Sequence, residues 1–239
     1  MPPHRPFFGD VKRQTVLLIA NDALPRYTTP MTIIQADRAR VRRTIIDMAL
    51  RRQRPGSGSA RTFQQQRTAV MQWPDLSAVL SPIPWAVVGA AATRLYMPER
   101  ATQDLDVAIA VTDVEAAHQN LRLAGLQLVG KLSIGGSTWR LSDGTLVDII
   151  EGSEEWWPRA LAAAQTNRDS QGLPVLPLAY LVLMKFQASR ARDLGDITQM
   201  LGLADENGLD EVRRIFAEYA LKEQADLESL ILLGKMEME

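Results

Sequence analysis

The sequence contains no cysteine and only two histidines among its 239 residues. Without cysteine the chain can form neither a disulfide nor a thiolate metal site, a composition that fits a reducing cytosol, and we expect a cytoplasmic protein. His4 lies in a proline-rich segment and His118 on the polar side of an expected helix, so we expect neither to form a site. A Ser-His-Asp set, a histidine-rich metal spacing and a glycine-rich P-loop are all missing from the sequence.

Long apolar runs are missing too. The longest, such as Leu176–Met184, are far shorter than the roughly 20 residues that a membrane-spanning helix needs. The N-terminus carries several prolines but no apolar core followed by a small-residue cleavage site, so we expect no signal peptide and no membrane partner. Hydrophobic residues still make up 46% of the chain, enough for the core of one large domain or two small ones.

Charge is distributed unevenly along the chain. The first 72 residues contain 13 Lys and Arg against 4 Asp and Glu, and the remainder contains 14 against 24. Seven clustered residues, here called the N-terminal arginines, are Arg38, Arg40, Arg42, Arg43, Arg51, Arg52 and Arg54. We predict that residues 31–72 bind an RNA, specifically tRNA, through its phosphates. Such a contact depends on salt concentration more than on base sequence. The alternatives are a solvated helix face, or a clamp on the acidic remainder of the chain.

The most informative stretch lies near the middle of the chain. An apolar run, Trp85–Val88, ends at Gly89; a short helix is expected over Ala90–Tyr96, and Asp104 and Asp106 then open a second apolar run. Because side chains alternate along a strand, the two carboxylates share a face, about 7 Å apart. Like charges repel unless a cation lies between them, and Mg²⁺ takes oxygen ligands of this kind. The pattern therefore predicts a magnesium site.

A third carboxylate lies inside a later apolar run. Asp148 interrupts the expected strand Thr145–Ile150, which a turn at Ser142–Gly144 joins to the run before it. Burying an unpartnered carboxylate is costly. Asp148 is therefore either exposed on an edge strand or a third ligand for the metal.

A charged cluster follows in the helical part of the sequence. Lys185 lies in a helix expected over Leu178–Arg190, and a second helix carries Arg192, Asp193 and Asp196. Residues three apart on a helix share a face, so the two carboxylates lie together. By charge alone Lys185 could neutralise a triphosphate. The alternatives are an exposed lysine and a surface ion-pair set, which is worth only a few tenths of a kcal/mol.

In this order the motifs resemble those of the DNA polymerase β-like nucleotidyltransferase superfamily. The resemblance covers about Asp75–Leu203 and is closest to the minimal nucleotidyltransferase branch, which includes abortive-infection type toxins. Its elements are Gly and a small residue, Asp-x-Asp, a strand Asp, a Lys, and Arg-Asp-x-x-Asp. The family has Gly-Ser or Gly-Gly where this chain has Gly89-Ala90. The alanine can offer phosphate only its backbone N–H, which suffices at a helix start.

The resemblance implies an α/β fold with a small mixed sheet as the nucleotidyltransferase core, flanked by helices and followed by an α-helical C-terminal half. We divide the chain into three parts on this basis. Residues 1–72 form a basic, partly helical extension, residues 73–165 the α/β core, and residues 166–239 the helical C-terminal domain. The site is expected in the cleft between core and helical domain.

The resemblance also implies an activity, a Mg²⁺-dependent transfer of a nucleotidyl group from an NTP to an acceptor hydroxyl. The setting implied is a toxin acting on tRNA, with a cognate antitoxin protein as partner. Asp104, Asp106 and Asp148 would be the catalytic residues and would bind two Mg²⁺ ions. The nucleotide would be bound by Gly89, Ala90, Arg100, Thr102, Lys185, Arg192, Asp193 and Asp196. The alternative is a catalytically inactive binding module or antitoxin component with the same fold, and convergence of the three carboxylates would argue against it.

Overall fold

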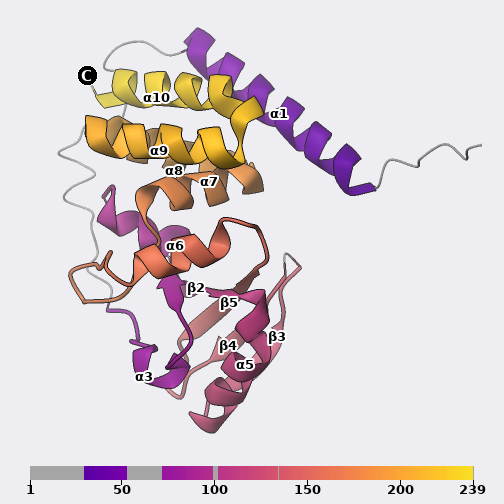
Figure 1. Cartoon of the computed structure of the whole chain (residues 1–239), viewed down its shortest axis with the longest axis vertical. Helices are drawn as coiled ribbons and strands as arrows, with labels where there is room; N and C mark the ends of the chain where they lie inside the picture. The colour runs from indigo at the N-terminus through magenta and orange to yellow at the C-terminus, as the bar shows by residue number, and fades with distance from the viewer. Residues whose placement is uncertain (1–29, 53–71, 99–101, 134, 239) are drawn as a thin grey trace, which may run out of the picture.

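The structure is a computed structural model that describes residues 30–52, 72–98, 102–133 and 135–238. It confirms the α/β fold with a helical C-terminal half: a five-stranded mixed sheet lies at one end of the molecule, and helices gather at the other (Figure 1). Of the residues singled out above, His4, Arg54 and Arg100 lie outside the described ranges.

The sheet has the strand order β1-β2-β5-β4-β3. Its strands are β1 Trp85–Val87, β2 Asp104–Ala110, β3 Gln127–Lys131, β4 Ser137–Arg140 and β5 Leu146–Gly152. β2 and β5 run parallel, and the other pairs are antiparallel. β5 is thus an interior strand, so the interpretation of Asp148 as a solvent-facing residue of an edge strand is wrong. The register places Asp106 directly opposite Asp148.

One face of the sheet is apolar and lies under α5, which spans Val114–Leu123. Leu105, Val147 and Trp139 stand opposite one another on three adjacent strands, and all are fully buried. His118 of α5 reaches this face, where its Nε2 lies 2.9 Å from the Ser137 hydroxyl and its ring 5.2 Å from that of Trp139. The expectation that His118 lies on the polar side of its helix is therefore wrong, and the histidine is part of the packing.

The helical half surrounds α7, which spans Leu178–Ala188 and is buried along almost its whole length. A helix that is apolar on all sides must be covered by others. α8 (Ala191–Leu203) and α9 (Glu206–Tyr219) supply that cover, and α10 (Gln224–Met238) packs on α8. The remaining short elements are α3 (Ser77–Leu80), α4 (Gly89–Ala92), η1 (Thr93–Leu95), η2 (Val111–Asp113), α6 (Trp157–Ala164) and η3 (Leu221–Glu223). Within the described ranges, no helix is both long and apolar enough to cross a membrane.

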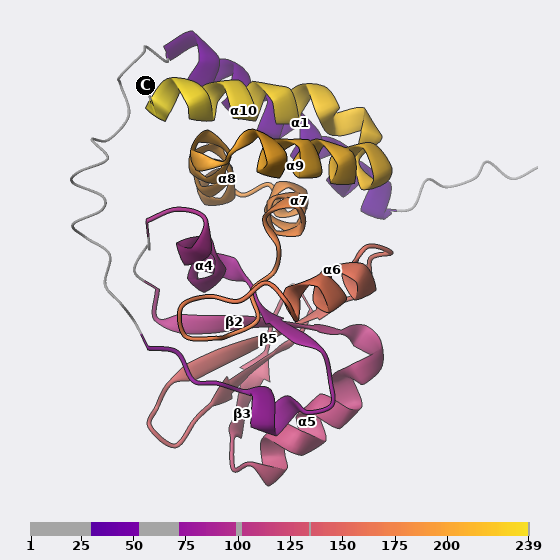
Figure 2. The ribbon, with the colours of Figure 1, turned by 60° about the vertical axis from the view of Figure 1, so that its left-hand side comes forward.

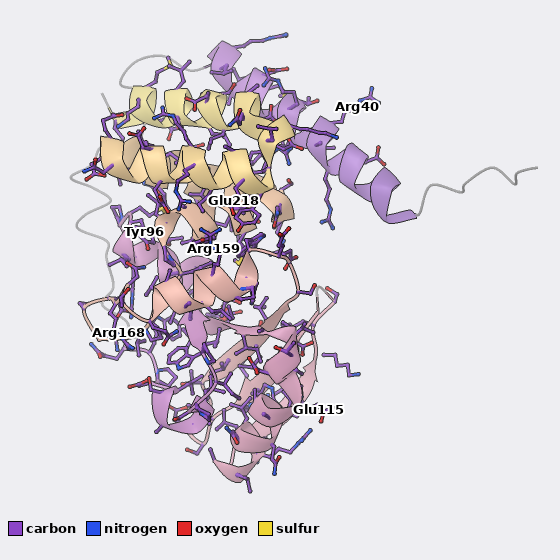
Figure 3. The ribbon with its side chains drawn as sticks, in the orientation of Figure 1. Arg40, Tyr96, Glu115, Arg159, Arg168 and Glu218 are labelled. Atoms are coloured by element: carbon purple, nitrogen blue, oxygen red, sulfur yellow. The ribbon has the colours of Figure 1, made fainter. Side chains whose placement is uncertain are left out.

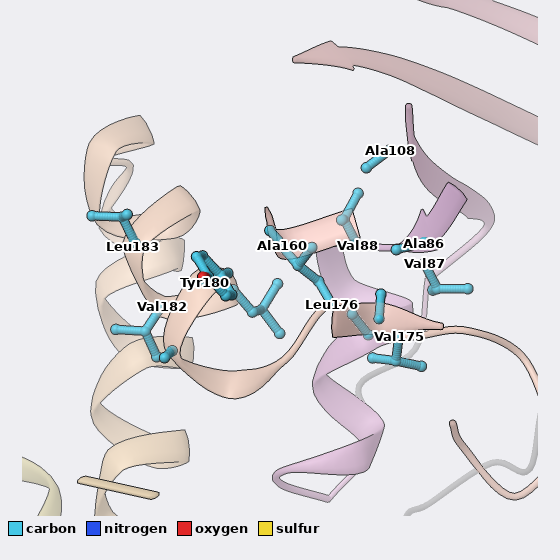
Figure 4. Close-up of a cluster of buried hydrophobic side chains, with 14 of the residues drawn as sticks. Ala86, Val87, Val88, Ala108, Ala160, Val175, Leu176, Tyr180, Val182 and Leu183 are labelled. Atoms are coloured by element: carbon cyan, nitrogen blue, oxygen red, sulfur yellow. The ribbon is translucent and has the colours of Figure 1, made fainter. Parts of the chain in front are cut away.

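The sheet and the helical half share one core. Figure 4 shows the apolar cluster at their junction, which includes Val87, Val175, Leu176 and Tyr180. The backbone of Val87 bonds on its free side to the segment before α7: its N–H donates to Pro174 (2.7 Å), and its carbonyl accepts from Leu176 (3.1 Å). The chain that enters α7 is therefore fixed to the edge of the sheet, so that α7 starts from a defined position.

The N-terminal helix α1, Pro30–Arg52, packs on α10 at the far end of the helical half, and both views show the two helices side by side (Figures 1 and 2). Its inward face buries Arg42 and Ile46, which are 4% and 1% exposed. Residues four apart lie on one face of a helix, so this pair fixes the face of α1 that contacts the protein. Arg42 forms ion pairs with Glu223 and Asp226, so for this residue the alternative of a solvated helix face is wrong and the alternative of a clamp on the acidic remainder of the chain holds.

Gly136 marks the bend between the loop at Leu132–Ser133 and β4. Its φ is +117°, and a Cβ at this position would lie 2.0 Å from the Ile149 carbonyl oxygen. We expect Gly136→Ala to lower the free energy of unfolding by about 2–4 kcal/mol, because it adds a backbone clash to an unfavourable φ.

Gly144→Ala is the matched control. Gly144 also has a positive φ (+92°), but a Cβ there would meet nothing within 4 Å. Only the conformational cost, about 1–2 kcal/mol, is expected. Urea unfolding of both variants measures the difference, and equal destabilisation would show that the contact with Ile149 does not matter.

Candidate active site

The turn after β1 brings backbone directly against a carboxylate. Gly89 has φ +64°, and a Cβ there would lie 1.8 Å from Oδ2 of Asp106. Only glycine satisfies both the backbone conformation and this close approach. The next N–H, that of Ala90, faces the Asp106 carboxylate and acts to lower its pKa. The predicted Gly-small turn is thus adjacent to the predicted Asp-x-Asp strand.

The three predicted carboxylates lie on one face of the sheet and line one cavity of about 620 Å³. Asp104 and Asp106 share a face because they are two apart on β2, and Asp148 stands beside Asp106 on β5. Gly89, Ala90 and Thr102, all expected at a nucleotide site, line the same cavity. The structure therefore brings together residues that come from three separate stretches of the sequence.

Each of the three carboxylates makes it harder for the others to ionise. Burial raises the pKa of Asp106 to about 6, and the neighbouring charges of Asp104 and Asp148 act in the same direction. The positive charge of Lys185 opposes them. A negatively charged group held beside two others in this way is stabilised by any cation that enters the cavity.

Two threonines hold the flanking carboxylates. Thr102 donates its hydroxyl to Oδ1 of Asp104 (2.7 Å), and Thr138 on β4 donates to Oδ1 of Asp148 (2.6 Å). Thr138 was not predicted from the sequence. Its signal was the hairpin itself, since the register of the turn places Thr138 opposite Asp148. Each bond fixes the orientation of one carboxylate.

Lys185 is 3% exposed and bonded to the acidic pair of α8. Its Nζ lies 2.9 Å from Oδ2 of Asp196 and 3.5 Å from Oδ1 of Asp193. The alternatives of an exposed lysine and of a surface ion-pair set are both wrong, because all three side chains are buried. A buried charge needs such partners. Asp196 lies outside the cavity lining and holds the lysine from behind, whereas Lys185 and Asp193 both line the cavity.

Asp193 leaves one buried acceptor without a hydrogen bond. Among the described residues its Oδ2 has no hydrogen-bond partner, and its ion pair with Nε of Arg190 is long, at 4.0 Å. Buried acceptors without donors are rare and costly. This oxygen therefore favours a ligand that carries a donor, such as a hydroxyl or an amino group.

Two exposed arginines complete the cavity on the α8 side, Arg190 and Arg192. Arg192 was predicted and Arg190 was not, although its place at the start of the same helix was the available signal. The opposite wall includes Ser133, from the glycine-rich segment before β4. The cavity thus combines carboxylates on the sheet with cationic groups on the helices.

The donor set has the chemistry of a magnesium site, three carboxylates facing one cavity. Among the described residues, however, no group of three His, Cys, Asp or Glu side chains is arranged to hold a metal ion as it stands.

No family model matches the sequence, and no curated protein matches it. Among solved structures, a crystal structure of ANT(2″)-Ia in complex with adenylyl-2″-tobramycin aligns with 69% of this chain and 95% of its own, at 13% identity and a TM-score of 0.39. The solution structure of the antibiotic-resistance factor ANT(2″)-Ia aligns with 66% of this chain and 85% of its own (12% identity, TM-score 0.36). Terminal uridylyl transferase 4 from Trypanosoma brucei with bound UTP aligns with 84% of this chain and 70% of its own, at 9% identity and a TM-score of 0.28. At these scores the likenesses assign neither a family nor an activity to this chain.

The raised pKa of Asp106 predicts how the metal-free protein responds to pH. The Asp106 carboxyl has a pKa near 3.8 in the unfolded state and about 6 in the folded state, so the folded state binds its proton more tightly. The stability that this proton contributes is fully present below pH 3.8 and is lost as pH rises through about 6. Asp106→Asn removes the ionisation. In EDTA we expect it to raise Tm by roughly 2–6 °C near pH 8 and to have little effect near pH 4.

Glu115→Gln is the control, since this exposed side chain on α5 projects away from the fold (Figure 3). It should change Tm at neither pH. If Asp106→Asn lowers Tm equally at both pH values, the carboxylate is not held at an electrostatic cost.

Proposed function

We propose that this chain is a nucleotidyltransferase, which moves a nucleotidyl group from an NTP to an acceptor hydroxyl. The observation that carries the proposal is the convergence of Asp104, Asp106 and Asp148 on a cavity that also receives Lys185. Acids alone would repel a triphosphate, and cations alone would bind one without activating an acceptor. At about 620 Å³ the cavity also has the size of a small-molecule site.

The three carboxylates would hold two Mg²⁺ ions, since hard oxygen donors of one charge sign suit this ion. When bound, Mg²⁺ offsets the negative charge of the phosphates and of the acceptor oxygen. The raised pKa of Asp106 supports this role, because cation binding would relieve the repulsion that contributes to the shift.

The chain's own groups divide the remaining tasks. Lys185, Arg190 and Arg192 supply positive charge toward the triphosphate, and the backbone at Gly89-Ala90 offers N–H groups. Asp148, held by Thr138, would accept the proton of the acceptor hydroxyl. The acceptor oxygen then bonds to the α-phosphorus, the α–β phosphoanhydride bond breaks, and pyrophosphate leaves. Positioning and charge compensation account for such a reaction.

A second candidate is a module that binds nucleotide without transferring it, or the antitoxin component of a pair. Two observations favour it: the described residues hold no ready three-ligand metal group, and Ala90 supplies no hydroxyl. It differs from the first candidate in one measurable property, the release of pyrophosphate.

The acceptor we propose is RNA, specifically tRNA, in a cytoplasmic toxin controlled by a cognate antitoxin protein. The structure reduces the N-terminal arginines available for such a contact. Arg42 is buried, and Arg43 is paired with Asp226 and Asp47. The exposed remainder on α1 comprises Arg38, Arg40, Arg51 and Arg52. Arg40 extends away from the body of the protein, where a phosphate backbone could reach it (Figure 3).

The transfer reaction is tested with purified protein, Mg²⁺, each labelled NTP in turn, and RNA and protein acceptors. We expect label transfer with one NTP and a loss of at least about 100-fold for Asp148→Asn, the proposed base. Glu115→Gln should keep full activity. Nucleotide binding without pyrophosphate release would support the binding module instead, and neither binding nor release across the panel would exclude both.

The RNA contact is tested by changing Arg38, Arg40, Arg51 and Arg52 together to Gln. We expect weaker tRNA binding and a slope of log K against log salt that is shallower by about 3–4, roughly one for each phosphate that the four side chains no longer neutralise. NTP binding should not change.

A matched variant changes four exposed arginines elsewhere, Arg122, Arg140, Arg168 and Arg214, to Gln. It should leave the salt slope as it is. An equal effect of both variants would show that the contact is not specific to α1, and an absence of tRNA binding at low salt would remove the RNA proposal.

A further inference from the structure

Arg42 connects the N-terminal helix to the turn between α7 and α8. Its Nη1 donates to the Ser189 hydroxyl (2.9 Å), and its guanidinium carbon lies 3.9 Å from the centre of the Phe186 ring. Nε donates to Asp226 (3.1 Å), and a further ion pair joins Arg42 to Glu223. A side chain that is 4% exposed and bonded to three segments is fixed in one orientation.

The turn that Arg42 contacts has an unusual backbone. Ser189 has φ +53°, the one positive φ of a non-glycine residue in the described ranges. Its N–H donates to the Lys185 carbonyl (3.0 Å) and its hydroxyl to that of Phe186 (2.5 Å), so that α7 ends there. A serine in this conformation needs support from its surroundings. Arg42 supplies a donor to the same hydroxyl.

The cations of the cavity lie on both sides of this turn. Lys185 lies four residues before Ser189, and Arg190 and Arg192 follow it closely. Phe186, next to Lys185, is packed between Arg42 and the ring of Phe216, which is 5.0 Å away. A shift of the turn would therefore move all three cationic groups together.

We propose that Arg42 is a positioning residue, which holds the α7–α8 turn so that its cations face the nucleotide. The expected change in KM for NTP rests on the proposed function, whereas the expected change in the mobility of the turn does not. The proposal gives α1 a role in the site without contact with substrate, and it gives a reason for the burial of one of the N-terminal arginines.

Arg43→Gln provides the control for Arg42→Gln. Arg43 also bonds to Asp226 (2.7 Å) but does not bond to Ser189. Hydrogen exchange of the full-length protein should show faster exchange at residues 187–193 in Arg42→Gln only. For NTP, Arg42→Gln should raise KM by about tenfold with a smaller change in kcat, because it disturbs binding more than the reacting groups. Arg43→Gln should leave KM unchanged.

Ser189 offers a second pair of variants. Ser189→Gly keeps the left-handed conformation and removes the hydroxyl, and Ser189→Ala removes the hydroxyl but retains the strain. If the bond from Arg42 positions the turn, both should speed exchange at 187–193, with Ala having the larger effect. Combining Ser189→Gly with Arg42→Gln should add less than the sum of the two single effects.

Unchanged exchange at 187–193 in Arg42→Gln, or equal acceleration in Arg43→Gln, would overturn the inference. A wild-type protein without NTP binding would instead overturn the proposed function, and the exchange result would still decide whether Arg42 holds the turn. Local acceleration with an unchanged KM would restrict Arg42 to a structural role and would also overturn the positioning proposal.

Discussion

Repulsion among three carboxylates on one face of the sheet is the constraint on which the rest of the site depends. The parallel pairing of β2 with β5 places Asp106 beside Asp148, and Asp104 follows from the alternation of the same strand. Burial and these neighbours raise the pKa of Asp106 to about 6. The surroundings offset the cost through donors: hydroxyls from Thr102 and Thr138, the N–H of Ala90 and the charge of Lys185. An arrangement that costs stability without a cation is typical of a site built to receive one.

The helical half contributes the opposite charge, and it does so through buried contacts. Lys185 is held by Asp193 and Asp196, which orient its ammonium group in a poorly solvated position. The turn that follows carries two further cations into the same cavity. Its left-handed serine and the arginine that reaches it from α1 link the site to the far end of the molecule. The proposed role of Arg42 therefore couples the cavity to packing between α1, the C-terminal end of α7 and η3–α10.

Several features were predictable because they rest on local periodicity. Alternation along a strand put Asp104 and Asp106 on one face, and the hairpin turn before β5 indicated its pairing with β4. Where the sequence left alternatives open, the deciding fact was a partner distant in sequence. Asp148 is not on an edge, because β2, 42 residues earlier at Asp106, pairs with β5. Lys185 is not exposed, since α8 folds back over α7. Arg42 is not solvated, because α10 and η3 place Asp226 and Glu223 against it.

The sequence by itself determined the α/β class, the positions of most helices and strands, and most of the charged groups that line the cavity, with Arg190 as the exception. Hydrophobic period and turn residues carry that information within windows of about ten residues. Only the tertiary structure decided which charges face the cavity and which neutralise one another inside the protein. The physical reason is that the sequence shows which side chains can carry a charge, whereas the interactions of that charge depend on the groups around it in the folded protein. Burial, the distance to a partner and the local dielectric are set by elements that meet only when the chain is folded.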